Sequence, residues 1–201
     1  MRLTGSETSP YVRKVRVQAM EGGYWEQLDF NELGTTPIDP NAGIANPLKK
    51  VPALELGDGM VLFDSRVICE YLDGALGDGA SFPAPGPARW TALRRQALGD
   101  GLLDAALLLR YETSLRPAEL CWNDWCDGQT VKIDGALADM EAQAADFGDT
   151  VDIGTITTAC ALGYLDFRYK DKGWRETYPA LGAWYAEFSQ RPSMTATVPP
   201  E

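Results

Sequence analysis

The sequence predicts a two-domain protein, with a small mixed α/β domain over residues 1–76 and an all-helical domain over residues 88–201. Three observations lead to this fold class. Strand and helix signals alternate in the first part of the chain, and helix signals fill almost all of the last part. Between the two parts, residues 77–87 read GDGASFPAPGP, where three prolines and three glycines favour an extended linker.

The first helix is expected at Pro10–Met20, after a short strand at Arg2–Thr4. Ser9 is a suitable cap, proline suits the first helical position, and Gly22-Gly23 ends the helix. The aromatic stretch Tyr24–Asn31 is predicted to be a strand.

A hairpin and a second helix complete the first domain. The apolar runs Ala53–Leu56 and Met60–Phe63 flank Gly57-Asp58-Gly59, a pattern typical of a tight hairpin. A helix is expected to begin at Ser65, and the preceding segment Asp39–Lys50 reads as irregular. This order of elements predicts a small sheet with both parallel and antiparallel strands and with helices on its faces.

The second domain is predicted to contain four main helices. They are expected at Ala88–Tyr111, Val131–Phe147, Ile153–Phe167 and Pro179–Phe188. The third is the most apolar, so we expect it at the centre of the domain, with Asp152 as its cap.

The charge balance excludes several classes of protein. The chain has 29 acidic and 18 basic residues, a net charge of −11 and no histidine. The acidic balance argues against nucleic acid and anionic membranes as partners. Without imidazole, Ser-His-Asp catalysis, Cys-His catalysis and His-ligated zinc sites are excluded, and we expect no metal.

The four cysteines are expected to be reduced and mostly buried. They are Cys69, Cys121, Cys126 and Cys160, and no C-x-x-C motif occurs.

The start of the chain lacks an apolar signal core, and no run approaches the roughly 18 apolar residues of a membrane span. We therefore expect a soluble, cytoplasmic protein.

Thr8-Ser9-Pro10-Tyr11 is the first candidate site. Ser9 follows a strand and stands where a helix begins, so its hydroxyl and the neighbouring N–H groups point to one spot. The helix dipole favours an anion there by about 0.3–1 kcal/mol, which suits a thiolate or a phosphate. Arg13, Lys14 and Arg16 are close by in sequence. The alternative is that Ser9 only caps its helix.

Two further motifs lie around the hairpin. The Val51-Pro52 bond is a candidate cis peptide, which would present the Val51 N–H and C=O to an extended ligand paired like an added strand. The alternative there is a trans proline at a strand start. Ser65 is the cap candidate of the next helix, whose first N–H groups suit a carboxylate, and Asp64 beside it suits an ammonium. Such a pair binds the end of an amino acid or peptide, and an ordinary capped helix is the alternative.

Five segments, in order, resemble the cytosolic glutathione transferase superfamily, and they look closest to small bacterial members with an active-site serine. They are TSPYVRKVRV, NPLKKVPALEL, LFDSRVICEYL, DIGTITTACALGYLDFR and ALGAWYAEFSQRPSMTATVPP. The resemblance runs essentially from end to end. It implies a thioredoxin-like N-terminal domain, an all-helical C-terminal domain, a homodimer, and glutathione as co-substrate.

The resemblance also implies roles for the residues singled out above. Ser9 would donate to the glutathione sulfur and keep it as thiolate, and Val51 would pair with the cysteinyl backbone of glutathione. Asp64 and Ser65 would hold the γ-glutamyl end. Lys50 would reach the glycine carboxylate or backbone.

The sequence departs from the family pattern in three places. Cysteine is absent from the active-site turn, which argues against glutaredoxin-like or disulfide-exchange activity. Thr155 stands where the family usually has aspartate, and Asp152 stands where it usually has serine or threonine. This exchange is expected to preserve a cap. Lys49 replaces a common glycine, so the glycine end of the ligand is expected to be held differently.

The electrophile pocket is expected between the domains. The residues proposed for its wall are Tyr11, Asp104, Leu108 and Tyr111. Asp100 and Asp104 share a helix face at i and i+4, where like charges repel slightly. For Asp104, solvated surface is the alternative.

The resemblance favours a detoxifying transferase that adds glutathione to small hydrophobic electrophiles. Glutathione-dependent isomerases, dehalogenases and peroxidases start from the same thiolate and stay open as alternatives. A non-catalytic glutathione-binding or scaffold protein of the same fold is a rival from another class. Glutathione binding and product analysis separate these functions.

Overall fold

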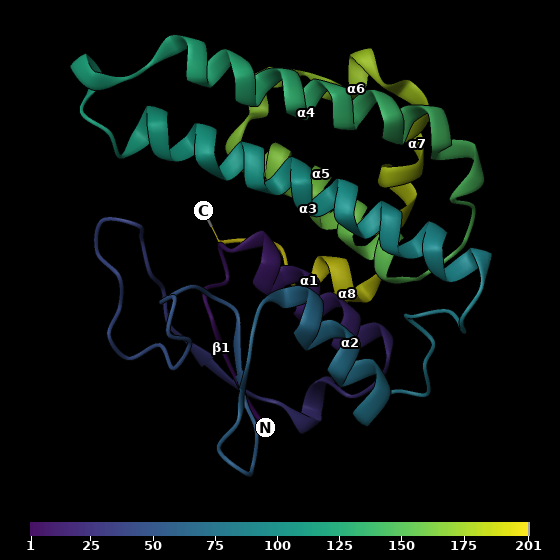
Figure 1. Ribbon diagram of the computed structural model, residues 1–201. Coiled ribbons are helices and arrows are strands. Elements are labelled where there is room, and N and C mark those ends of the chain that lie inside the picture. Colours follow the sequence, from purple (N-terminus) through teal and green to yellow (C-terminus); the bar gives the residue numbers. More distant parts are fainter. Residues whose placement is uncertain (201) are drawn as a thin grey trace.

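The computed structural model describes residues 1–200 and has the two-part architecture that the sequence predicts (Figure 1). The first part contains strands β1 (Arg2–Gly5), β2 (Asp29–Glu32), β3 (Ala53–Glu55) and β4 (Val61–Leu62). Its helices are α1 (Pro10–Glu21) and α2 (Ser65–Ala75). Residues 76–86 form neither helix nor strand and lead into the helical part.

The four strands form one mixed sheet in the order β2-β1-β3-β4. Strand β1 pairs in parallel with β2 and antiparallel with β3, and β3 and β4 form the predicted antiparallel hairpin. In the register, Thr4 lies opposite Ala53, and Leu54 lies opposite Leu62. The end of β1, the start of β3 and the end of β4 therefore lie at the same edge of the sheet.

The prediction of a strand over Tyr24–Asn31 is wrong for the first half of this range. A 3₁₀ turn, η1 (Trp25–Gln27), precedes β2, and Leu28 N donates to Trp25 O at 3.0 Å. Tyr24 is buried in the core, so this aromatic stretch is held by packing of individual side chains and not by strand pairing. The turn brings β2 alongside β1.

The second part is helical, and its central helix is the one expected. The long helices are α3 (Pro87–Ser114), α4 (Asn123–Gln143), α5 (Ile153–Arg168) and α7 (Pro179–Phe188). All residues of α5 from 153 to 165 are buried. Helix α4 begins earlier than predicted, and the expected last turn is instead a 3₁₀ helix, η3 (Ala144–Asp146). The short elements are η2 (Ala118–Leu120), η4 (Lys170–Lys172), α6 (Trp174–Thr177) and α8 (Pro192–Thr195).

The structure confirms that α5 keeps its cap although Asp152 and Thr155 are exchanged relative to the family pattern. Asp152 Oδ1 accepts from Gly154 N and Thr155 N at 2.8 and 2.9 Å. Thr155 Oγ1 accepts in return from Asp152 N at 3.0 Å. The two side chains therefore form a reciprocal capping box with the usual roles intact.

The last turn of the chain packs back onto the first domain. Helix α8 lies against α1, as Figure 1 shows. The Arg13 guanidinium donates to Met194 O at 2.9 Å, and Arg191 forms a two-pronged ion pair with Glu21. These contacts join the C-terminal segment to α1, the helix that begins beside Ser9.

Close packing of α5 on α3 gives a testable effect at one glycine. A Cβ on Gly154 would lie 2.7 Å from Ala92 O and 2.7 Å from Arg95 Cβ. Since a backbone carbonyl has little freedom to move, we expect Gly154→Ala to lower the free energy of unfolding by about 1–3 kcal/mol in a urea titration.

Gly135→Ala is the matched control in α4. A Cβ there meets nothing within 4 Å. Alanine favours helix over glycine, so this change is expected to raise stability by roughly 0.5–1 kcal/mol. Equal effects of the two changes would show that α5 does not pack this closely on α3.

The cysteines are free, and only two are fully buried. Cys69 and Cys160 lie in the core, where burial raises the pKa of their thiols to about 12 and about 11. Cys121 and Cys126 are half-buried, contrary to the expectation of mostly buried thiols, with their Sγ atoms 3.8 Å apart.

Among residues 1–200, no helix is both long and apolar enough to cross a membrane, and no cluster of metal-binding side chains occurs.

Candidate active site

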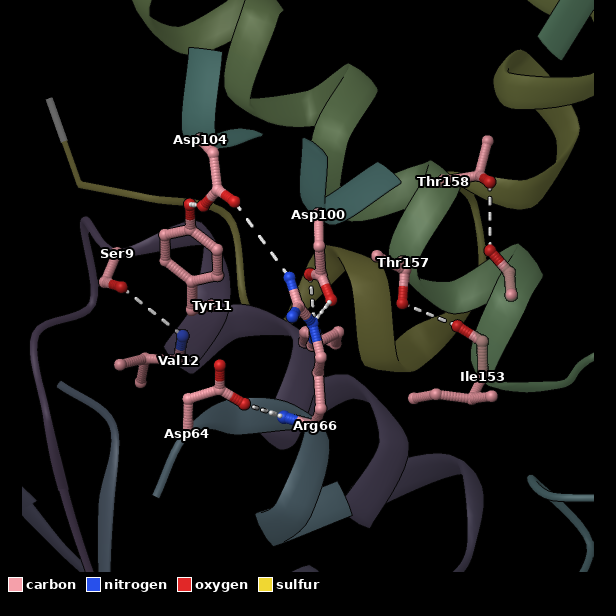
Figure 2. Close-up of polar contacts among 12 residues, drawn as sticks. Ser9, Tyr11, Val12, Asp64, Arg66, Asp100, Asp104, Ile153, Thr157 and Thr158 are labelled. Atoms are coloured by element: carbon pink, nitrogen blue, oxygen red, sulfur yellow. Dashed lines mark hydrogen bonds and ion pairs between the residues drawn. The ribbon is translucent and has the colours of Figure 1, made fainter. Parts of the chain in front are cut away.

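The three sequence motifs meet at one edge of the sheet. Ser9 follows β1, Val51 precedes β3, and Asp64 follows β4, and the strand register places these three ends together. Figure 2 shows Ser9, Tyr11 and Asp64 around the start of α1, below Asp104 of α3. Residues far apart in sequence therefore lie near one another at this edge of the sheet, next to α3 of the second domain.

Ser9 caps α1 and keeps its hydroxyl hydrogen available. Its Oγ accepts from Val12 N at 3.4 Å, which is the only hydrogen bond of this side chain within residues 1–200. Pro10 has no N–H, and Tyr11 N has no acceptor among the described residues. A half-buried O–H donor and a free N–H thus stand at the positive end of the helix dipole. Capping and anion binding are compatible here, because they use different atoms of Ser9.

The bond between Val51 and Pro52 is cis, as the sequence predicts. The Val51 N–H and C=O have no hydrogen-bond partner within residues 1–200, so this short edge is open to an added strand. Lys50 is exposed beside it.

Lys49 explains why a glycine is expected at its position. Its φ is 53°, the left-handed region that side chains other than glycine rarely adopt. Its Nζ donates to Ile44 O at 2.8 Å and Ala42 O at 3.3 Å, so the ammonium turns back to its own loop.

The cap of α2 is Asp64, which corrects the assignment of Ser65 as the capping residue. Asp64 Oδ1 accepts from Arg66 N at 2.9 Å, and Ser65 is the first residue within the helix. The second carboxylate oxygen of Asp64 has no partner among residues 1–200. The Ser65 hydroxyl has none either. The pair therefore offers an acceptor for an ammonium and donors for a carboxylate.

Tyr11 and Asp104 contact each other across the two domains. The Tyr11 hydroxyl donates to Asp104 Oδ1. Burial, followed by this hydrogen bond, raises the pKa of Tyr11, so its phenol stays protonated near neutral pH. Because the Tyr11 hydroxyl hydrogen is engaged by Asp104, Ser9 is the freer hydroxyl donor at the start of α1. Asp104 is exposed, which agrees with the alternative of solvated surface. It also accepts this interdomain hydrogen bond.

The other two residues predicted for the electrophile pocket follow Asp104 on the same face of α3. Leu108 and Tyr111 lie about one and two turns further along. Leu108 is exposed and Tyr111 is half-buried.

Arg66 forms ion pairs with both Asp104 and Asp100, and the interdomain role was missed for Asp100. Its carboxylate is buried and lies 2.6 Å from Lys14 Nζ and 2.8 Å from Arg66 Nε (Figure 2). Two cations from α1 and α2 therefore surround one anion of α3. The signal in the sequence was an aspartate among the apolar residues of a long helix, which requires a partner when buried.

The basic residues that follow Ser9 in the sequence bind other parts of the protein. Arg13 bonds to the C-terminal segment, and Lys14 pairs with Asp100. Arg16 pairs with Glu7 at 2.8 Å. All three are buried and already engaged, so none of them is a free side chain at Ser9.

Comparison with known proteins identifies the family of this chain. Residues 8–75 match the family model described as glutathione S-transferase, N-terminal domain, and residues 123–187 match that of the C-terminal domain. The "Uncharacterized GST-like protein YibF" of Escherichia coli K12 is 35% identical over 206 residues, with 100% of both chains covered.

Two solved structures from Pseudomonas fluorescens Pf-5 are similar to this chain. One, a glutathione transferase family member with bound glutathione, is 48% identical, covers 100% of this chain and 99% of its own, and has a TM-score of 0.97. The other, with bound S-(propanoic acid)-glutathione, is 47% identical over 100% of both chains, with a TM-score of 0.93. The chain therefore belongs to the glutathione S-transferase family.

Proposed function

We propose that this protein is a glutathione transferase that holds the glutathione thiolate at Ser9 and adds it to small hydrophobic electrophiles. The free hydroxyl hydrogen of Ser9 at the start of α1 is the observation that carries the proposal. A relative that is 48% identical over the whole chain binds glutathione, which supports glutathione as the ligand of this edge.

The free groups at the site match the parts of glutathione. The Val51 N–H and C=O pair with the cysteinyl backbone, and Lys50 lies close to the glycine end. Asp64 receives the γ-glutamyl ammonium, and Ser65 donates to the γ-glutamyl carboxylate. The cysteine sulfur then lies toward Ser9.

The free energy required for thiolate formation is within reach of this site. A free thiol has a pKa near 8.5, and lowering it by about two units needs ~2.7 kcal/mol. A hydrogen bond to a charged acceptor supplies roughly 1.5–3 kcal/mol, and a helix N-terminus adds about 0.3–1 kcal/mol. No general base is needed, which suits a chain without histidine.

The space beyond the sulfur is the pocket for the second substrate. The Pf-5 relative with bound S-(propanoic acid)-glutathione holds a substituted sulfur, so we infer that this chain also accepts an S-substituent there. Tyr11, Asp104, Leu108 and Tyr111 remain our assignment for its wall.

A homodimer is part of the proposal, and exposed apolar side chains on α2 and α3, among them Val67, Tyr71 and Trp90, support a face for a second copy. We also propose a cytoplasmic location and a role in detoxification.

Product analysis tests the proposal. Purified protein is incubated with glutathione and with a haloalkane, a maleyl compound or a hydroperoxide, and the products are identified by mass spectrometry. We expect a glutathione S-conjugate of the hydrophobic electrophile. Isomerised product or reduced peroxide without a conjugate would reassign the enzyme, and glutathione binding without any product would support the scaffold.

A further inference from the structure

Two half-buried cysteines face each other in the turn between α3 and α4. Cys121 follows the short helix η2, and Cys126 lies near the start of α4. Their Sγ atoms are 3.8 Å apart, so the two thiols are in contact. This turn lies at one end of the helical part, where α3 and α4 run side by side (Figure 1). The conjugation proposed for Ser9 uses neither thiol.

Backbone hydrogen bonds hold the segment that carries the two cysteines. Cys121 N donates to Ala118 O at 3.3 Å, and Cys126 N donates to Trp122 O at 3.1 Å. Between them, Trp122 N donates to Glu112 Oε1 at 3.0 Å, which ties the turn to the end of α3. The facing thiols therefore belong to a hydrogen-bonded turn that keeps them next to each other.

Solvent access distinguishes this pair from the other two cysteines. Cys69 and Cys160 have no exposed surface and lie in the two separate hydrophobic cores of the protein. Cys121 and Cys126 are only partly covered. Since a thiol must be accessible to react, a reagent in solution reaches this pair in the folded protein and not the core cysteines.

The charges near the pair favour a small, uncharged reagent. Asp124 and Asp127 are exposed residues on either side of Cys126 in the sequence. Glu112 contacts the turn as well, although Arg116 pairs with it at 2.8 Å. The chain as a whole carries a net charge of −11. Anionic reagents are repelled by such surroundings, whereas a neutral hydroperoxide is not.

We propose that Cys121 and Cys126 are a redox-sensitive modification site, at which a hydroperoxide produces a reversible intramolecular disulfide. A disulfide needs its sulfurs about 2.05 Å apart, and rotations about the two Cα–Cβ bonds bring thiols already in contact to this distance. The new bond closes a ring that includes Trp122 and Trp125, whose side chains are exposed and stack with their ring centroids 6.5 Å apart. Oxidation therefore fixes these two aromatic side chains in one arrangement.

The oxidation proceeds in two steps. One thiolate attacks the terminal oxygen of the hydroperoxide, so an S–O bond forms, the O–O bond breaks, and the alkoxide leaves and takes up a proton as the alcohol. The second thiol then attacks the sulfenic sulfur, an S–S bond forms, and the hydroxyl leaves as water. The two thiols lose two electrons and two protons in total, and the hydroperoxide is reduced.

Glutathione reverses the oxidation by thiol–disulfide exchange. One glutathione thiolate opens the disulfide to a mixed disulfide, and a second releases the protein thiol as glutathione disulfide forms. Burial, followed by the hydrogen bond with Cys121, raises the pKa of the Cys126 thiol. Its thiolate is therefore scarce at neutral pH, and we expect the disulfide to form slowly, over minutes to hours.

Peptide mapping of the native protein tests the proposal. The folded protein is treated with hydrogen peroxide, the free thiols are alkylated after unfolding in acid, and the digest is analysed by mass spectrometry. We expect the peptide that contains Cys121 and Cys126 to lose two hydrogen atoms and to carry no alkyl group. Cys69 and Cys160 are the internal controls and should be alkylated in full. Excess glutathione should restore both alkylation sites of the oxidised peptide.

Two matched variants test whether the thiols act as a pair. Cys121→Ser and Cys126→Ser each leave one thiol without a neighbour, so its sulfenic acid should persist, react with a 1,3-diketone probe and oxidise further to the sulfinic acid. The native protein should give neither product. Unchanged thiols, a disulfide between two chains, or added oxygen without an S–S bond in the native protein would each overturn the proposal. The oxidation step needs no glutathione, so its outcome is independent of the function proposed for Ser9.

Discussion

Asp100→Asn is expected to lower the free energy of unfolding by about 3–5 kcal/mol, because it leaves the buried ammonium of Lys14 without a countercharge. The Asp100 carboxylate and the Lys14 side chain are almost completely inaccessible to solvent. The amide also weakens the contact with Arg66, whose Nε donates to Asp100 at 2.8 Å. A urea titration followed by circular dichroism measures the loss.

The double variant Lys14→Met with Asp100→Leu separates the charge from the packing. Replacing both partners with apolar side chains removes the uncompensated charge, so we expect it to recover more than half of the lost stability. Asp104→Asn is the control one turn away. Since Asp104 is exposed and the new amide oxygen still accepts from Tyr11, we expect a change within about 0.5 kcal/mol. A loss below about 1 kcal/mol for Asp100→Asn would show that this buried cluster does not join the domains.

Ser9→Ala is expected to lower kcat/KM for glutathione conjugation at least tenfold at pH 7. Removal of the hydroxyl takes away a hydrogen bond to the thiolate worth roughly 1.5–3 kcal/mol, so the pKa of the bound thiol rises toward its free value near 8.5. The rate should therefore recover as the pH is raised, and a pH–rate profile measures the shift.

Two companion variants separate this chemistry from the helix cap. Ser9→Gly lacks the hydroxyl but costs a helix only a few tenths of a kcal/mol, whereas alanine costs about 1 kcal/mol. We expect Ser9→Gly to lose activity as Ser9→Ala does while melting close to the native protein. Ser9→Thr keeps a hydroxyl and should retain more activity than either. Full activity in Ser9→Ala would remove Ser9 from the mechanism.

Local sequence signals predicted the main elements, because those signals act over a few residues. Proline at the start of α1, the glycines of the hairpin and the apolar run of α5 each determine structure nearby. Boundaries were less certain. Helix α4 begins at Asn123, where a weakly apolar first turn hid its start. The cap of α2 was misplaced by one residue, since Asp64 and Ser65 both suit a cap and only the backbone distinguishes them.

The tertiary partners of charged residues could not be predicted from the sequence. Lys14 and Asp100 are 86 residues apart, and their contact depends on how α1 packs against α3. Lys14 therefore read as part of a basic patch beside Ser9.

Calorimetric titration with glutathione, followed by an ultraviolet scan of the bound thiol across pH, tests the central claim most directly. The account predicts that glutathione binds and that its thiol pKa falls about two units below the free value near 8.5, an effect that Ser9→Ala reverses. Binding with an unshifted thiol pKa would contradict thiolate activation at Ser9, and no binding at all would contradict the function proposed for this site.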